Sequence, residues 1–209
     1  MVLAIATKLE STGREAIPVV IDHSLQENSA TFTSETLQKL ALLNFEKVES
    51  LRIKVEITDG IEASARRARY AAFDQIATKF SSSVFFLGHT ENDLAESVLL
   101  GLARGSGTRS LSGIAQVNGI YVRPFLSITR EITEQVCSEN SVEPWMDPHN
   151  SDQQFARVRV RKNILPMMER DLGPGISEAL ARSSRILRDD ADALDLWAER
   201  FFSEEDYLS

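Results

Sequence analysis

Short apolar segments alternate along the chain with longer segments in which apolar residues recur at helical spacing. The short segments are rich in β-branched and aromatic residues and predict strands at residues 17–21, 48–57 and 84–87, with one more at 119–122. The longer segments predict an opening helix and then helices at residues 29–43, 61–80, 92–102 and 129–139. This alternation favours an α/β fold with a Rossmann-like open parallel sheet and flanking helices.

Glycine and proline separate the carboxyl end from this alternating region. The sequence Asp-Leu-Gly-Pro-Gly at residues 171–175 interrupts the pattern, and residues 176–201 predict one long helix. We therefore expect an α/β domain over residues 1–170. Residues 171–209 would form a helical extension or the start of a further region.

Composition and charge restrict the class of protein. With a single cysteine, no apolar run of membrane-spanning length and no secretory signal, a soluble protein of the reducing cytoplasm is expected. The formal net charge of −8 argues against a general nucleic-acid coat. Residues 157–162 nevertheless form a local basic run, and the acidic residues after Asp189 are expected to form only a solvated helix face.

Residues 88–113 concentrate the groups most suited to chemistry. They follow the strand predicted at 84–87, and ligands bind at the carboxyl edge of a parallel sheet. We expect Asn92 to cap the helix, with Asp93 and Glu96 on one of its faces. Such a carboxylate pair can hold a cation, either Mg²⁺ or a substrate ammonium; from spacing alone, the commoner role is only to stabilise the helix end.

A glycine-containing loop follows that helix. Arg104 and Arg109 flank Gly105 and Gly107, and guanidinium groups beside free backbone amides suit phosphate oxygens. The glycines would equally serve as a helix C-cap and a flexible exit.

Residues 88–113 resemble the GHxxDDQxET and RGSGxxGLxGM motifs of the tRNA(Ile)-lysidine synthase family, which belongs to the N-type ATP pyrophosphatases with a PP-loop. Further segments resemble motifs of the same family in the same order: 22–25 (VDHGL), 60–70 (GIEAxARxxRY), 123–126 (RPLL), 145–150 (WxDxSN) and 155–166 (FxRNRIRxxxxP). Asn92, Leu94 and Val158 depart from these patterns, while Asp93 and Glu96 are kept.

The larger departure is at the amino end. Family members begin with a strand and an SGGxDS loop that wraps the ATP phosphates, whereas residues 1–6 resemble the helix after that loop. The resemblance thus leaves two alternatives from different classes. One is a lysidine-forming ligase in truncated form; the other is a noncatalytic tRNA-binding or lysine-binding remnant.

The family resemblance implies a reaction and its participants. ATP adenylates the C2 oxygen of the wobble cytidine in the CAU anticodon of tRNA-Ile, and the amine of free lysine then displaces AMP. The implied cofactors are ATP and Mg²⁺, and the implied partners are tRNA-Ile and lysine. The residues leave the oligomeric state open.

The resemblance also assigns expected roles to particular residues. Asp93 and Glu96 would bind lysine and orient its amine, and His89 would either assist proton transfer or act as a structural hydrogen-bonding group. Contacts to ATP, or in part to the tRNA, are expected from Arg66, Arg69, Arg104, Gly105, Gly107 and Arg109. Contacts to RNA are expected from Arg157, Arg159, Arg161, Asp147 and Asn150.

Two of these expectations have simpler alternatives. Asp147 and Asn150 lie in an Asp-Pro-His-Asn sequence that is also ordinary turn chemistry. No dedicated metal site is expected, because His23, His89 and His149 lack the close spacing of preformed metal sites.

Overall fold

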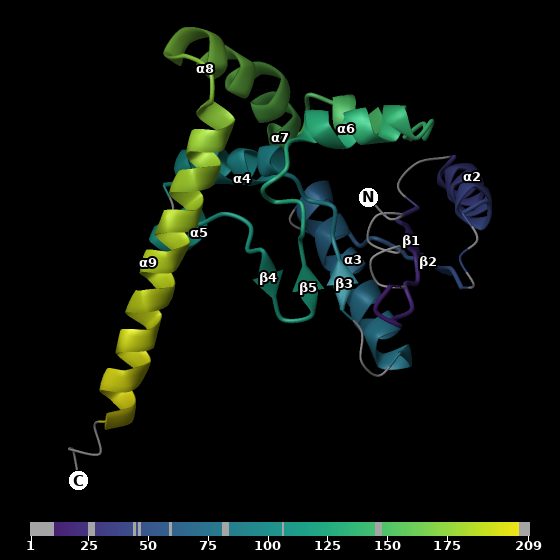
Figure 1. Cartoon of the computed structure of the whole chain (residues 1–209), viewed down its shortest axis with the longest axis horizontal. Coiled ribbons are helices and arrows are strands. Elements are labelled where there is room, and N and C mark those ends of the chain that lie inside the picture. Colours follow the sequence, from purple (N-terminus) through teal and green to yellow (C-terminus); the bar gives the residue numbers. More distant parts are fainter. Residues whose placement is uncertain are drawn as a thin grey trace. The chain divides into compact units, whose positions relative to one another are not determined.

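The computed structural model describes residues 11–24, 28–43, 45, 47–58, 60–80, 84–105, 107–144 and 148–204. The chain forms two compact units, Met1–Phe85 and Phe86–Ser209. Figure 1 shows their helices and strands. The opening helix expected before residue 11 lies outside the described residues, and the domain boundary expected near residue 170 stays a prediction.

The first unit contains a parallel strand pair with a helical crossover. Strands β1 (Val19–Asp22) and β2 (Glu49–Arg52) pair in parallel, and helix α2 (Ser29–Ala41) lies between them in the chain. The prediction of parallel strands is confirmed here, but β2 is shorter than the predicted strand at 48–57. Two residues after β1 ends, Ser24 has a φ of 52°.

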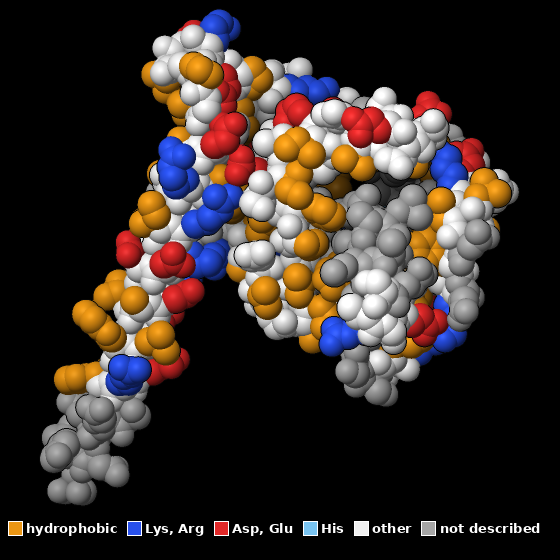
Figure 2. Space-filling view, in the orientation of Figure 1, with side chains coloured by type: hydrophobic (Ala, Val, Ile, Leu, Met, Phe, Trp, Pro, Cys, Tyr) orange, Lys and Arg blue, Asp and Glu red, His pale blue; other side chains and the backbone are white. Residues whose placement is uncertain are grey.

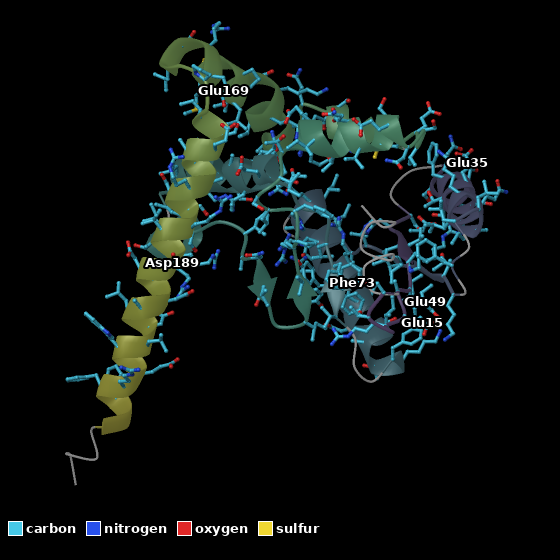
Figure 3. The ribbon with its side chains drawn as sticks, viewed as in Figure 1. Glu15, Glu35, Glu49, Phe73, Glu169 and Asp189 are labelled. Carbon is cyan, nitrogen blue, oxygen red and sulfur yellow. The ribbon has the colours of Figure 1, made fainter. Side chains whose placement is uncertain are left out.

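Helix α3 (Ile61–Lys79) supplies most of the buried apolar side chains of the first unit. Phe73 is buried, and its ring centroid lies 4.9 Å from that of Phe85 and 5.9 Å from that of Tyr70 (Figure 3). Aromatic pairs at these separations add to the stabilisation that burial gives. The helical spacing of apolar residues at 61–80 therefore predicted this element correctly.

Two strands of the second unit form a hairpin. Strand β4 (Val117–Asn118) pairs antiparallel with β5 (Tyr121–Val122), and the sheet order is β3-β5-β4, where β3 is Phe85–Phe86. The strand predicted at 119–122 is wrong in its first half, because Gly119 has a φ of 56° and forms the turn with Ile120. The partner strand β4 was not predicted.

Helices make up the rest of the second unit. Helices α4 (Glu91–Ala103) and α6 (Arg130–Glu139) match the predicted segments closely. The elements not predicted are short: α5 (Thr108–Leu111), η1 (Pro148–Ser151), α7 (Ala156–Arg159), the π-helix η2 (Val160–Ile164) and α8 (Leu165–Leu172). The chain then breaks at Gly173 and Gly175, as expected, and continues as α9 (Ile176–Glu204).

Helix α9 packs against α4 and α5, as Figure 1 shows. Ala181 of α9 joins Leu94 of α4 and Leu126 in one buried cluster. The end of α9 has the opposite character, and Figure 2 shows hydrophobic side chains along it; Trp197 is 70% exposed. In the part of the chain that the structure describes, no helix is both long and apolar enough to cross a membrane.

Candidate functional site

The site begins at the amino end of α4, which starts one residue earlier than predicted. Thr90 is the N-cap, and both its backbone N–H and its hydroxyl donate to Oδ2 of Asp93, at 2.8 and 2.9 Å. The assignment of Asn92 as the cap is wrong, because a threonine followed three residues later by an acidic residue forms a capping box. Asn92 instead accepts a hydrogen bond from the backbone N–H of Arg130 at 2.8 Å.

Asp93 and Glu96 lie on the same side of α4, as their spacing predicted. One guanidinium group contacts both, since Nη2 of Arg161 lies 3.4 Å from Oδ1 of Asp93 and 3.0 Å from Oε2 of Glu96. The Glu96 side chain is completely buried, and 15% of the Asp93 side chain is exposed. Buried carboxylates require charged partners, and the structure supplies them from distant segments.

Three arginines surround these carboxylates. Arg161 forms the closest pair, with Nε 2.6 Å from Oε1 of Glu96, while Arg157 Nε lies 3.4 Å from Oε2. Arg130 Nη2 lies 3.3 Å from Asp93 Oδ1 and 3.5 Å from Glu96 Oε1. We call these five residues the α4 charge cluster. Three guanidinium groups face two carboxylates, so the cluster carries an excess of positive charge.

The surroundings shift the pKa values of two members of the cluster. Burial would raise the pKa of Asp93, but hydrogen bonds from Thr90 and the positive charges of Arg130 and His89 together hold it below its ordinary value. Burial would lower the pKa of Arg161, yet its hydrogen bond and charge interaction with Glu96 raise it above its ordinary value. Both groups therefore stay charged at neutral pH.

A hollow of about 470 Å³ borders the charge cluster. Glu96, Arg130 and Arg161 line it together with a set of further glutamates, Glu91, Glu131, Glu169 and Glu178. A hollow of this volume is within the range of small-ligand sites. Its wall offers carboxylates to a cationic group and guanidinium groups to an anionic one.

The described residues do not fit a metal ion held by the protein. Among them, no group of three His, Cys, Asp or Glu side chains is arranged to hold one. Asp93 and Glu96 accept hydrogen bonds or ion pairs from Arg130 and Arg161.

The glycine loop after α4 has two arginines in different surroundings. Arg104 is the C-cap of α4 and is exposed, and Gly105 follows with a φ of 64°. Gly107 is the extended N-cap of α5. Arg109 pairs with Asp192 and Asp195 of α9, and these hydrogen bonds raise its pKa. The sequence predicted that the acidic carboxyl end is only a solvated helix face. The structure differs, because Asp192 and Asp195 bind Arg109.

In the basic run at residues 157–162, some cationic side chains contact α4 and others are exposed to solvent. Arg157 donates to Oγ of Ser97 at 2.8 Å and, like Arg161, belongs to the charge cluster on α4. Arg159 is exposed and donates to the backbone carbonyls of residues 153 and 154, and Lys162 is exposed. The run therefore presents only part of its charge to solvent.

The remaining candidate residues are scattered. Arg66 and Arg69 belong to α3 in the first unit, where Arg66 lies over the Tyr70 ring at 4.9 Å from its centroid. His89 is half-buried directly before the cap of α4, and Asn150 is exposed in η1. Asp147 lies outside the described residues.

Sequence reasoning missed Arg130. It is the first residue of α6, and 37 residues separate it from Asp93. No local spacing indicates such a contact. A helix cap at Thr129 could have been recognised, but the bond from the Arg130 backbone to Asn92 forms only when the start of α6 meets the start of α4.

The parallel strand pair and the flanking helices define an α/β protein. Residues 1–168 match the family model described as the PP-loop domain, and the chain belongs to this ATP-utilising family.

Two curated relatives cover most of the chain. It is 49% identical over 188 residues to the tRNA(Ile)-lysidine synthase of Thermobifida fusca and 46% identical over 200 residues to that of Streptomyces coelicolor. These matches cover 90% and 94% of this chain but 58% and 57% of the relatives. The chain therefore spans less than two thirds of their length.

A solved structure shares the fold. It is the U34-tRNA thiolase NcsA from Methanococcus maripaludis with its [4Fe-4S] cluster, which matches with a TM-score of 0.68 and 11% identity. The match covers 90% of this chain and 68% of the thiolase chain. At this identity the likeness shows the fold alone.

Proposed function

We propose that the chain is the PP-loop portion of a tRNA(Ile)-lysidine synthase, a ligase that uses ATP to join lysine to a tRNA. The observation that carries this proposal is the 49% identity to the Thermobifida fusca enzyme over 90% of the chain. The 470 Å³ hollow beside the α4 charge cluster supports it, because Glu91, Glu131, Glu169 and Glu178 line this hollow and the reaction needs a place for a small cationic amino acid.

The proposed reaction has two steps. The C2 oxygen of the wobble cytidine in the CAU anticodon of tRNA-Ile attacks the α-phosphorus of ATP, and pyrophosphate leaves. The neutral ε-amine of lysine then forms a bond to C2, the bond from C2 to the adenylate oxygen breaks, and AMP leaves. The ε-ammonium of lysine must lose a proton before the second step, because only the neutral amine is a nucleophile.

The charge cluster suits that proton loss. We assign Asp93 and Glu96 to binding lysine and orienting its amine. Oδ1 of Asp93 is the acceptor held least tightly, since its arginine contacts are 3.3 and 3.4 Å long. The positive charge of Arg130 and Arg161 near this oxygen would lower the pKa of an incoming ammonium and so favour the neutral amine.

Other candidate residues take part in the proposal as binding groups. His89, next to the N-cap of α4, would assist proton transfer or contact the nucleotide. Contacts to ATP are assigned to the set Arg66, Arg69, Arg104, Gly105, Gly107 and Arg109. Contacts to tRNA-Ile are assigned to the set Asp147, Asn150, Arg157, Arg159 and Arg161. Mg²⁺ enters only as the counter-ion of the ATP phosphates.

A lysine-incorporation assay tests the proposal. Radiolabelled lysine, ATP and a tRNA-Ile transcript with a CAU anticodon are incubated with the 209-residue chain. A second protein carries the same chain preceded by a strand and an SGGxDS loop of the family pattern. A transcript whose wobble cytidine is replaced by uridine is the matched control, because it lacks the 4-amino group of the target base.

The outcomes separate the two functional alternatives. ATP-dependent transfer of label to the cytidine transcript, and not to the uridine transcript, is the expected result for the second protein at least. Absence of transfer with both proteins overturns the proposal. Binding of tRNA or lysine by both, without transfer or pyrophosphate release, would instead support a noncatalytic binding role.

A further inference from the structure

Helix α9 begins after the end of the PP-loop match at residue 168, yet it binds the backbone next to the proposed phosphate loop. Oγ of Ser184 donates to the carbonyl of Ser112 at 2.8 Å. Arg188 Nη2 donates to the same carbonyl at 2.6 Å and to that of Gly113 at 2.9 Å. Two side chains of α9, one helical turn apart, therefore hold two consecutive carbonyls.

The side chains around this contact between α9 and the backbone at residues 112 and 113 are closely packed. Ser112 and Ser184 are buried, with exposed fractions of 0% and 1%. Gly113 has a φ of 59°, and a Cβ atom on it would lie 2.7 Å from Cδ1 of Leu94 and 3.1 Å from Oγ of Ser184. The chain after α5 is thus pressed between α4 and α9, and its position depends on both helices.

The segment at residues 104–111 contains α5, and apart from residue 106 it is described by the structure; it is held at both ends. It begins at Arg104, the C-cap of α4, and it ends at the carbonyls that Arg188 and Ser184 hold. Between these ends, Arg109 is held by Asp192 and Asp195 of the same helix α9. Figure 1 shows α5 lying directly beside α9.

We propose that Arg188 is a positioning residue for ATP use: together with Ser184 it fixes the segment at residues 104–111, so that Arg104 and the backbone amides of the segment meet the phosphates. The inference rests on the proposed function, since it concerns how that site is assembled. It also makes α9 part of the working site, although the PP-loop match ends before this helix.

A purely structural role for Arg188 predicts a different result. A residue that only fastens α9 to the second unit would, when removed, weaken the whole unit and lower the amount of active protein. Its loss would then reduce kcat and leave the KM for ATP unchanged. A positioning role predicts a local loss of order in the loop and a higher KM for ATP.

The test compares substitutions on α9 by two measurements. Arg188→Met removes the donors and keeps much of the apolar stem, and Arg188→Lys keeps a cationic donor. Arg182→Met is the matched control, because Arg182 is an exposed arginine on the same helix. Hydrogen exchange is measured on the 209-residue chain, and KM and kcat are measured in the lysine-incorporation assay.

In Arg188→Met we expect amide protection at residues 104–113 to fall by about tenfold, with α9 and the first unit unchanged. We expect the KM for ATP to rise by about tenfold, with partial rescue in Arg188→Lys and no change in Arg182→Met. Unchanged loop protection overturns the inference, and so does a fall in kcat with an unchanged KM.

The exchange measurement needs no activity. Loop protection that is retained in Arg188→Met therefore overturns the positioning role even if the protein makes no lysidine. Absence of lysidine from both unsubstituted proteins, with and without the added SGGxDS loop, overturns the proposed function alone, because a loop that loosens in Arg188→Met would still show what Arg188 holds in place.

Discussion

Arg161 and Glu96 form a bidentate ion pair across 65 residues of sequence, with Nε 2.6 Å from Oε1 and Nη2 3.0 Å from Oε2. The Glu96 side chain is completely buried, whereas 24% of the Arg161 side chain is exposed. A planar guanidinium group matches both oxygens of a carboxylate, so the pair fixes direction as well as distance. It joins helix α4 to the π-helix η2.

The first prediction concerns the stability that this pair provides. Glu96→Gln leaves Arg161, Arg157 and Arg130 beside a neutral amide, and we expect a loss of about 3 kcal/mol in the free energy of unfolding. Urea denaturation followed by circular dichroism measures this loss. Asp171→Asn is the control, because Asp171 pairs with Arg170 at the exposed surface, where an ion pair contributes less than about 1 kcal/mol. Equal losses in the free energy of unfolding for Glu96→Gln and Asp171→Asn would contradict the expectation that the buried ion pair contributes more than the exposed one.

The second prediction separates the two steps of the proposed reaction. Asn at position 93 keeps an amide oxygen to accept the hydrogen bonds of Thr90, but it lacks the charge that attracts an ammonium. We therefore expect Asp93→Asn to lower lysine use by about a hundredfold and pyrophosphate release by much less. Rapid-quench measurement of both products from one reaction tests this. Equal loss in the two steps would reject the lysine-binding role of Asp93.

Local patterns predicted much of the fold, because each pattern reports one element. The apolar period identified α3, α4 and α6, and the glycines at 173 and 175 marked the break before α9. The same reasoning missed the hairpin at β4 and β5, since strands of two residues are too short to show alternation. Short elements such as β4 and β5, which depend on pairing with a neighbouring strand, have no recognisable local sequence pattern.

The candidate site was also predicted only where a local pattern reports it. Spacing alone placed Asp93 and Glu96 on one helix face. It could not show that Arg130, Arg157 and Arg161 neutralise them, because ion pairs between distant segments form only when those segments pack together. The resemblance assigned Arg157 and Arg161 to RNA, and this assignment stays a prediction; their place in the charge cluster was not predicted.

The third prediction concerns the tRNA affinity of the basic run. Arg157 belongs to the charge cluster, whereas Arg159 and Lys162 are exposed. A cation that contacts phosphate releases a counterion, so its removal lowers the salt dependence of binding by about one unit of slope. We expect this decrease for Arg159→Ala and Lys162→Ala, and a smaller one for Arg157→Ala. Filter binding of tRNA at several salt concentrations measures the slopes. The reverse order would assign RNA contact to the buried side of the run.

The fourth prediction concerns the close packing of Gly113 between Leu94 of α4 and Ser184 of α9. Gly113→Ala introduces a Cβ 2.7 Å from Cδ1 of Leu94 at a backbone φ of 59°, so we expect a loss of about 2 kcal/mol in stability. Gly107→Ala is the control, because its φ is −73° and nothing lies within 4 Å of the added carbon. Thermal unfolding of the two variants measures the difference. Similar melting temperatures would show that the contact at Gly113 relaxes without cost.

The last prediction uses the carboxylate at the amino end of α9. Glu169, labelled in Figure 3, accepts backbone N–H bonds from Gly175 at 2.7 Å, Ile176 at 3.1 Å and Ser177 at 2.9 Å. The bond from Ser177 contributes most, and together with the other two it lowers the pKa of Glu169 below the ordinary value of 4.5, against the opposing effect of burial. The negative charge also lies at the positive end of the helix dipole.

The lowered pKa fixes the sign of the pH effect. A carboxyl group with a lower pKa in the folded state stabilises the fold fully above its unfolded pKa, and this contribution is lost as the pH falls through the folded pKa. Glu169→Gln should therefore cost about 1 kcal/mol at pH 7 and less at pH 3, which lies below the ordinary glutamate pKa of 4.5. Urea denaturation at both pH values measures the costs. Glu178→Gln removes a charge from the first turn of α9 without removing the three hydrogen bonds that Glu169 of α8 accepts, so it controls for charge alone. A cost for Glu169→Gln that is equal at both pH values would show that the cap works by shape and not by charge.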